Sequence, residues 1–281
     1  HYNRKKAWFP NWARVERRYF SMLDDMDSLI KGINEFKPDV IRGYGSALNL
    51  IFEEVFRSGR ELHLPRSLIY SADSMSPGIK RKVIEELKLP VHSIYSCVES
   101  LQVGFECGCN NGYHLNEDCY PVRIVDYQNR PLPEGVPGKV IISNLVNRAN
   151  VILNYELGDE AMILPGKCEC GRTQRRLSLN ITRVADRLEL ENGSGIHPIT
   201  FAEVVYYEKD LWQHQAVQTG KYEFDILLVT DPVADRPAME RRLMREFDKW
   251  FQGRIRVRIR FVDRIEVTSG GKQRALVLKR S

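Results

Sequence analysis

Four residues of metal-ligand type stand in two separated pairs near the middle of the chain. Cys107 and His114 form a C-x6-H pair, and Cys168 and Cys170 form a C-x-C pair. Zinc takes four tetrahedral ligands of these types, and a closed set of three thiolates and one imidazole is structural, with no open position for water. All six cysteines lie between Cys97 and Cys170. In a chain without a secretory signal, such clustering indicates a metal before disulfides.

Three alternatives stay open for these thiols. Cys109 lies two residues after Cys107 and could replace it as a ligand, and Cys119 is a further spare thiol. The cysteines could instead be reduced and buried, next to a hydrogen-bonded histidine. A catalytic Cys/His pair is the weakest alternative, because the thiols are clustered and nothing marks one of them as a lone nucleophile.

Carboxylates at the ends of strand-like runs form the second group of candidate residues. Asp159 directly follows a glycine at the end of an apolar run, and a turn there would leave its carboxylate free to face a ligand. Asp73 and Glu99 lie in loops after two other strand-like runs. Glu99 suits magnesium, which prefers one or two carboxylates plus phosphate oxygens. The alternative for Glu99 is a surface carboxylate at a helix start, and for Tyr95 a core aromatic.

Elements that would position these residues alternate between helix and strand over residues 1–105. Helical spacing is expected over 22–36, 46–57 and 78–88, and strands over 39–44, 67–71 and 91–95. Ser46 is expected to cap the second helix. Repeated βα units predict a parallel sheet with ligand loops at the carboxyl ends of its strands.

Residues after 105 change character twice. Strand signals separated by turns dominate to about residue 182, which predicts a small antiparallel barrel. They cover 122–125, 139–142, 151–155 and 177–181. From residue 187 a hairpin, an amphipathic helix and a strand predict a separate α+β unit. These elements are expected at 216–229, 237–251 and 254–262.

Several motifs occur in a fixed order along the chain. They are Y-x-x-x-E at 95–99, Y-x-x-G-D at 155–159, C-x-C-G-R at 168–172, R-x-x-D at 183–186 and G-K-x-R at 271–274. The combination resembles the adenylate-forming enzymes, more narrowly their phenylacetate–coenzyme A ligase branch, which includes relatives in capsule biosynthesis. The resemblance implies an α/β fold with a large-domain sheet portion at 1–105, a β-barrel subdomain with the zinc site at 106–186 and a mobile α+β lid at 187–281.

The resemblance also implies an activity, an ATP-dependent carboxylic-acid ligase. The acid attacks the α-phosphate of ATP and expels pyrophosphate, and the acyl-adenylate then meets a thiol, usually that of coenzyme A. The implied roles are adenine binding for Ala72, Asp73 and Tyr95, ribose binding for Asp159, ribose or phosphate binding for Arg183, a hinge at Asp186, magnesium binding for Glu99, zinc binding for Cys107, His114, Cys168 and Cys170, and, for Lys272, contact with the reacting carboxylate and α-phosphate. On its own, Lys272 reads as a solvated lysine in a basic tail.

Two departures from the family pattern affect these expectations. The family's Ser/Thr/Gly-rich phosphate loop is absent, and nothing in residues 1–38 could cradle a triphosphate. The chain is therefore expected to be the C-terminal part of a longer enzyme. Glu191 precedes the turn at 192–195 where the ligase carries a basic residue, so a carrier-protein thiol, an amine or a sugar hydroxyl stays open as acceptor. The alternative function is a non-catalytic, zinc-stabilised module that binds a nucleotide or a partner.

Composition limits the remaining classes of protein. The chain has 281 residues, 43% of them hydrophobic, and a net charge of +5 that suits anionic ligands. No apolar run approaches the roughly 20 residues of a membrane span, and no signal peptide is present, so we expect a cytoplasmic protein. The alternating arginines of 254–260 read as the solvated face of a strand before a phosphate-gripping face. Nucleic-acid binding ranks last, because aromatic residues for base stacking are missing there. No sequence feature indicates a homodimer, although relatives form them.

Overall fold

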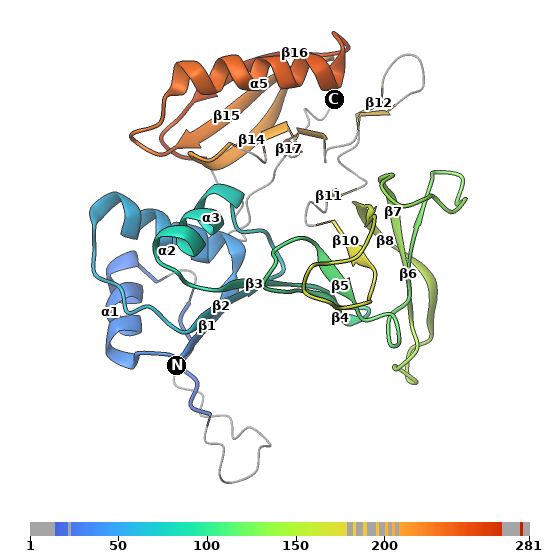
Figure 1. Cartoon of the computed structure of the whole chain (residues 1–281), viewed down its shortest axis with the longest axis horizontal. Helices are drawn as coiled ribbons and strands as arrows, with labels where there is room; N and C mark the ends of the chain where they lie inside the picture. Colours follow the sequence, from blue (N-terminus) through green and yellow to red (C-terminus); the bar gives the residue numbers. More distant parts are fainter. Residues whose placement is uncertain are drawn as a thin grey trace.

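The computed structural model describes most of the chain. The described residues are 15–21, 24–178, 182–183, 188–189, 195–196, 200–201, 204–205, 208–265 and 276–277. Figure 1 shows helices α1 to α3 beside strands β1 to β3, antiparallel strands to their right, and the body formed by α5 and β14 to β16 above. Within these residues, no helix has both the length and the apolar character needed to cross a lipid bilayer.

A seven-stranded sheet with the order β1-β2-β3-β4-β5-β10-β9 forms the base of the molecule. Its first three strands are parallel, and they are β1 (Val40–Tyr44), β2 (Ser67–Ser71) and β3 (Val91–Cys97). Parallel neighbours need crossover connections, and these are helices α2 (Gly45–Ser58) and α3 (Pro77–Glu86), with α1 (Met26–Phe36) preceding β1. The parallel βα sheet expected from the sequence is confirmed.

The start of helix α2 differs from the expectation. Tyr44 occupies the N-cap position and makes no side-chain cap hydrogen bond, and Ser46 lies inside the first turn. The hydroxyl of Ser46 donates to Asp73 Oδ2 at 2.5 Å, and its backbone N–H donates to Asp73 Oδ1 at 3.2 Å. The prediction that Ser46 caps the helix is therefore wrong. A carboxylate from a distant loop satisfies the helix N-terminus, where negative charge is favourable.

Antiparallel strands extend the same sheet beyond residue 105. They are β4 (Leu101–Glu106), β5 (Tyr113–Leu115), β10 (Arg176–Leu177) and β9 (Ile163–Leu164). A second, four-stranded antiparallel sheet has the order β11-β8-β7-β6. Its strands are β6 (Val122–Val125), β7 (Gly138–Asn144), β8 (Ile152–Ala161) and β11 (Thr182–Arg183). The antiparallel strands of the first sheet and the second sheet share a buried core. In the described part of the chain, the strands of the two sheets do not pair into a closed barrel.

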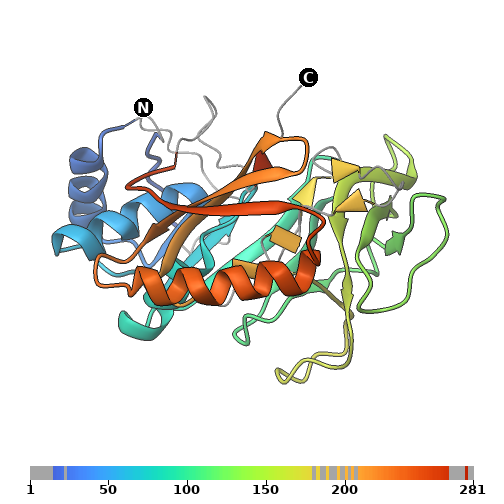
Figure 2. The same cartoon turned by 90° about the horizontal axis from the view of Figure 1, so that it is seen from above.

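The C-terminal body is a four-stranded sheet packed against helix α5 and against the helical residues 200–201 and 204–205. Its elements are β14 (Leu211–Gly220), β15 (Glu223–Thr230), β16 (Arg256–Phe261), β17 (Leu276–Val277) and α5 (Arg236–Phe251), preceded by the short pair β12 (Leu188–Glu189) and β13 (Gly195–Ile196). Figure 2 shows α5 running along the strands. Buried phenylalanines pack in the core of this body. Phe224 lies in β15, Phe247 and Phe251 lie in α5, and Phe201 lies in the helical segment before β14.

Arginines alternate along β16 as the sequence predicts. Exposed residues alternate with half-buried ones through the strand. The buried carboxylate of Asp225 pairs with Arg258 Nε at 3.2 Å and Arg260 Nε at 2.8 Å. Both guanidinium groups thus have an internal counter-charge, which supports a solvated strand face.

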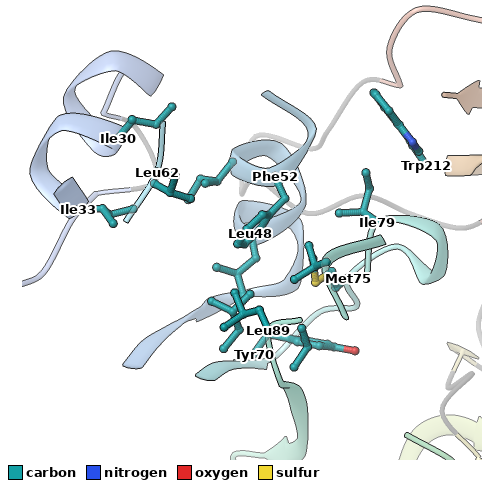
Figure 3. Close-up of a cluster of buried hydrophobic side chains, with 14 of the residues drawn as sticks. Ile30, Ile33, Leu48, Phe52, Leu62, Tyr70, Met75, Ile79, Leu89 and Trp212 are labelled. Atoms are coloured by element: carbon teal, nitrogen blue, oxygen red, sulfur yellow. The ribbon is translucent and has the colours of Figure 1, made fainter. Parts of the chain in front are cut away.

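One aromatic side chain docks the C-terminal body on the parallel sheet layer. Trp212 of β14 is 1% exposed and belongs to the same buried cluster as Phe52 of α2 and Ile79 of α3 (Figure 3). The fit at this junction is close. A Cβ added to Gly78 would lie 1.5 Å from the carbonyl oxygen of Leu211, so a larger residue at position 78 would push the two bodies apart.

His214 makes this junction sensitive to pH. It shares a small enclosed space with Pro77, Gly78 and Glu208, and burial lowers its pKa to about 4. The folded protein keeps the imidazole neutral, whereas the unfolded chain takes up a proton below about pH 6.5. We expect the free energy of unfolding to fall by about 2 kcal/mol between pH 6.5 and pH 4 from this group alone. Urea titrations across this range measure it.

The variant His214→Gln should remove this part of the pH dependence. His63→Gln is the matched control, because His63 lies away from the junction, with its ring nitrogen 3.2 Å from the carbonyl oxygen of Pro38. An unchanged pH profile in His214→Gln would show that His214 is not the titrating group.

Candidate functional site

The carboxyl ends of β1, β2 and β3 bring the predicted ligand loops to one edge of the sheet. Parallel strands end at the same edge, and the pairing of Ser71 with Ile94 places Ala72 beside the position of Tyr95. The helix that follows β1 begins at this edge as well. The backbone of the parallel strands therefore brings these loops together, as the sequence predicts.

The loop after β2 is pinned on the N-terminus of α2. Both carboxylate oxygens of Asp73 accept hydrogen bonds from Ser46. Ala72 has a positive φ of 73°, which is a strained conformation for a residue with a side chain. Gly45 is needed for the close approach, because an added Cβ would lie 2.3 Å from the backbone nitrogen of Met75. Ala72 is exposed, so the backbone of the loop is accessible to a ligand. The Asp73 carboxylate is already hydrogen-bonded to the N-terminus of α2.

Tyr95 and Asp159 meet between the two sheets. The hydroxyl of Tyr95 donates to Asp159 Oδ2 at 2.8 Å, and both residues are buried. The pairing register of β7 and β8 shifts between Lys139 and Ile141, and Gly158 has a φ of 72°. This bulge aims Asp159 towards β3. The expectation that Asp159 lies on a turn after the strand is wrong, since it lies inside β8 and Tyr95 holds its carboxylate.

Glu99 lies in the turn between β3 and β4. Its backbone carbonyl accepts a hydrogen bond from Asn144 Nδ2 at 2.8 Å, and the side chain is half-buried. The turn ends at Leu101 with a φ of 50°. Glu99 thus lies two residues after the end of β3, at the same edge of the sheet as Ala72 and Tyr95.

Three predicted residues have no described side chain. The backbone of Arg183 in β11 pairs with that of Asp159 in β8, so the two residues are neighbours across the strands. Asp186, the expected hinge, and Lys272, the expected catalytic lysine, lie outside the described residues.

The second site is a cluster of three thiols and one imidazole. The ligand atoms of Cys107, His114, Cys168 and Cys170 all lie within 4.8 Å of one another. The neighbouring strands β4, β5, β10 and β9 bring them together. Cys107 follows β4, His114 lies in β5, and the other two cysteines lie in the loop between β9 and β10. The sequence prediction that the two separated pairs form one group agrees with this geometry.

The spacing of the cluster fits a tetrahedral zinc ion. Zn–S bonds of about 2.3 Å in a tetrahedron place two sulfurs about 3.8 Å apart, and Cys107 Sγ lies 3.7 Å from Cys168 Sγ. Cys170 Sγ lies 3.4 Å from His114 Nε2. The sulfur separation is too long for a disulfide, which needs about 2.05 Å. Cys109 is exposed and stands outside the group of four, which favours Cys107 as the ligand.

The surroundings give the thiols different acidities. The backbone N–H of Arg172 lowers the pKa of Cys170 to about 7, whereas burial raises the pKa of Cys107 to about 12. Zinc binds thiolates, so its binding must displace the Cys107 proton, and metal affinity should fall in acid.

Sequence reasoning missed Arg176 beside this cluster. Its side chain is buried, Nη1 donates to the carbonyl of Asn111 at 2.9 Å, and Nη2 donates to that of Pro165 at 3.1 Å. One guanidinium thus bonds to the loop after β4, which carries Cys107, and to the loop after β9, which carries Cys168 and Cys170. The run of charged residues around Arg176 resembles a surface segment, and only the tertiary structure separates the buried arginine from its neighbours.

Comparison with known proteins shows which proteins the chain resembles. Residues 188–279 match the CapK C-terminal domain. Phenylacetate-coenzyme A ligase of Thermus thermophilus is 28% identical over 192 residues, which cover 66% of this chain and 43% of the relative. Protein CapK of Staphylococcus aureus is 19% identical over 266 residues, which cover 89% of this chain and 55% of the relative.

Solved structures agree with this assignment of the fold. A 2-hydroxyisobutyryl-CoA ligase in a postadenylation state, in complex with an acyl-AMP, has a TM-score of 0.70 at 19% identity, covering 91% of this chain and 57% of that one. The same ligase gives TM-scores of 0.57 in an open conformation and 0.52 in a thioesterification state. The match therefore depends on the conformation of the relative.

The fold is similar to that of solved adenylate-forming ligases. In sequence, the chain is similar to the phenylacetate–coenzyme A ligases and to CapK. The chain spans about half the length of the curated relatives it matches.

Proposed function

We propose that this chain supplies the nucleotide-binding edge and the lid of an ATP-dependent carboxylic-acid ligase. The observation that carries the proposal is the buried contact between Tyr95 and Asp159 beside the loop at Ala72. It places an aromatic ring, a carboxylate and an exposed backbone loop together at the carboxyl edge of a parallel sheet, where ligands of open α/β sheets bind.

Each residue at this edge receives a role from its chemistry. Asp159 accepts hydrogen bonds from the ribose hydroxyls, with the Tyr95 hydroxyl fixing the carboxylate. The Tyr95 ring and the backbone at Ala72 and Asp73 contact the base. Glu99 holds magnesium, which neutralises phosphate charge when bound. Arg183 binds the ribose or a phosphate.

The reaction proceeds in two displacements. A carboxylate oxygen of the acid attacks the α-phosphorus of ATP, the bond to the bridging oxygen breaks, and pyrophosphate leaves with that electron pair. The nucleophilic atom of the acceptor then attacks the acyl carbon, and AMP leaves while the acceptor loses its proton. Lys272 stabilises the charge shared between the entering and bridging oxygens. Positioning and charge neutralisation carry the rate.

The lid and its hinge complete the proposal. Residues 187–281 act as the lid, 1–105 and 106–186 form the body, and Asp186 is the hinge between them. The TM-score between this chain and one structural relative falls from 0.70 in the postadenylation state of the relative to 0.52 in its thioesterification state. This difference supports a body and a lid that change position. Acceptors include coenzyme A, a carrier thiol, an amine or a hydroxyl, and relatives named as coenzyme A ligases support a thiol.

Zinc is the structural metal in this proposal. Cys107, His114, Cys168 and Cys170 hold it in a closed site without a position for substrate. It ties the loops after β4 and β9 together and leaves the chemistry to the nucleotide edge.

The test is acid-dependent ATP–pyrophosphate exchange by the protein as its cell makes it, with a panel of aromatic and hydroxy acids. Exchange with at least one acid is the expected result. AMP binding without exchange for any acid would favour the alternative, a zinc-stabilised module that binds a nucleotide or partner. That alternative is supported by the metal cluster alone, which needs no catalysis.

A further inference from the structure

Helix α2 carries a row of buried polar side chains on one face. Ser46, Asn49 and Glu53 are spaced three and four residues apart, so they lie on one side of the helix. They are 8%, 4% and 7% exposed. Buried polar groups are costly unless they are hydrogen-bonded, and each of these has partners outside the helix or along the row.

One end of the row holds the loop at the nucleotide edge. Ser46 donates to the carboxylate of Asp73. Asn49 Oδ1 accepts from the backbone N–H of Ser76 at 3.1 Å. A single turn of α2, from Ser46 to Asn49, therefore fixes both ends of the loop segment 73–76, which follows β2 and leads into α3.

The other end of the row holds the C-terminal body. Glu53 Oε1 accepts from Asn49 Nδ2 at 2.8 Å and from Gln213 Nε2 of β14 at 2.5 Å. Gln213 is 7% exposed and follows Trp212 in the docked strand. Glu53 Oε1 thus links α2 to the C-terminal body, the proposed lid, through a direct hydrogen bond.

Other contacts at this junction involve helix α3. Lys82 pairs with Asp231, and Arg81 Nη2 donates to the carbonyl of Glu208 at 3.3 Å. These contacts hold α3 against the C-terminal body, and Leu211 of β14 approaches Gly78. The row on α2 adds a separate series of hydrogen bonds, from Gln213 through Glu53 and Asn49 to Ser76.

We propose that Glu53 is a positioning residue, which couples docking of the lid to the order of the loop segment 73–76. When Gln213 leaves, Glu53 loses one donor and must recruit water or move, and Asn49 must follow because both share the same oxygen. The loop then loses its anchor at Ser76. The proposal rests on the proposed function only where it treats this loop as part of a nucleotide site.

The decisive variant changes a residue of the lid, and its effect is measured at the loop segment 73–76. Gln213→Leu keeps volume and removes the donor. Hydrogen exchange measured by mass spectrometry on the full protein should accelerate in β14 and also at 73–76, by about five-fold or more, the lower end of coupling between sites. Faster exchange in β14 with unchanged exchange at 73–76 would overturn the proposal.

Glu53 variants separate positioning from packing. Glu53→Gln keeps an acceptor oxygen for both donors and should exchange like the wild type at both segments. Glu53→Leu should accelerate both, and an equal acceleration in Glu53→Gln would contradict the role of the shared oxygen. Glu85→Leu is the matched control, an exposed carboxylate on α3 that should change neither segment.

Nucleotide affinity gives a second readout. Gln213→Leu should weaken AMP binding about five-fold at unchanged far-UV circular dichroism, although Gln213 does not lie at the proposed nucleotide edge. If the wild-type protein binds no AMP, the proposed function fails, and the exchange experiment still decides whether the lid and loop are coupled. Wild-type affinity in Gln213→Leu together with unchanged loop exchange would refute the coupling itself.

Discussion

Removing zinc from the cluster of Cys107, His114, Cys168 and Cys170 is expected to lower the free energy of unfolding by about 5 kcal/mol, a fraction of the 10–16 kcal/mol by which zinc stabilises zinc-finger peptides. The ligands come from two segments more than fifty residues apart in the sequence, and the metal closes that loop. Elemental analysis should find one zinc per chain. Calorimetry before and after chelation measures the loss of stability.

Single-residue variants identify the zinc ligands. Cys168→Ser should lose the zinc and show the lower stability without a chelator, because a neutral hydroxyl is a poor replacement for a thiolate. Cys109→Ser is the matched control and should retain both zinc and stability, since Cys109 is exposed outside the cluster. Equal zinc loss in the two variants would show that the ligand set is different. A metal-free native protein with unchanged stability would remove the zinc proposal.

The second large effect is expected at the nucleotide edge. Asp159→Ala should weaken ATP binding by about 100-fold, because two charge-assisted hydrogen bonds to ribose hydroxyls contribute about 3 kcal/mol together. Isothermal titration calorimetry on the full-length protein measures this loss. Tyr95→Phe should weaken binding only a few-fold, because it keeps the ring and removes only the hydroxyl that orients the carboxylate.

Lys272→Ala is the complementary variant for the same site. It should leave ATP affinity within a few-fold and reduce pyrophosphate exchange by about 10³-fold, the effect of removing one group that stabilises transition-state charge. The two variants thus separate binding from chemistry. Normal exchange in both Asp159→Ala and Lys272→Ala would show that the site assignment is wrong.

Much of the fold follows from local patterns in the sequence. The βα repeats predict the parallel strands, and the hairpin and amphipathic helix of the C-terminal body are visible as periodicity. The metal cluster was also predictable, because cysteine and histidine pairs at short spacing have few other uses. These features need only residue types and distances along the chain.

What the sequence could not give depends on contacts between distant segments. Ser46 has the residue type of a helix cap, but Asp73 from another loop takes that role. The bulge that turns Asp159 inwards is a matter of strand register. The continuation of the parallel sheet into the antiparallel strands β4 and β5 also depends on strand pairing, which composition does not reveal.

The arginine row on β16 has a consequence for how molecules of this protein meet. Among the described strands, β16 lies at the edge of its sheet, and an edge strand offers unpaired N–H and C=O groups to any other strand. A second copy that added its own β16 there would set two rows of guanidinium groups against each other, with Asp225 already paired inside each molecule. Like charges directly opposite destabilise strand pairing. The row of arginines on β16 thus acts as a barrier against aggregation through this sheet edge.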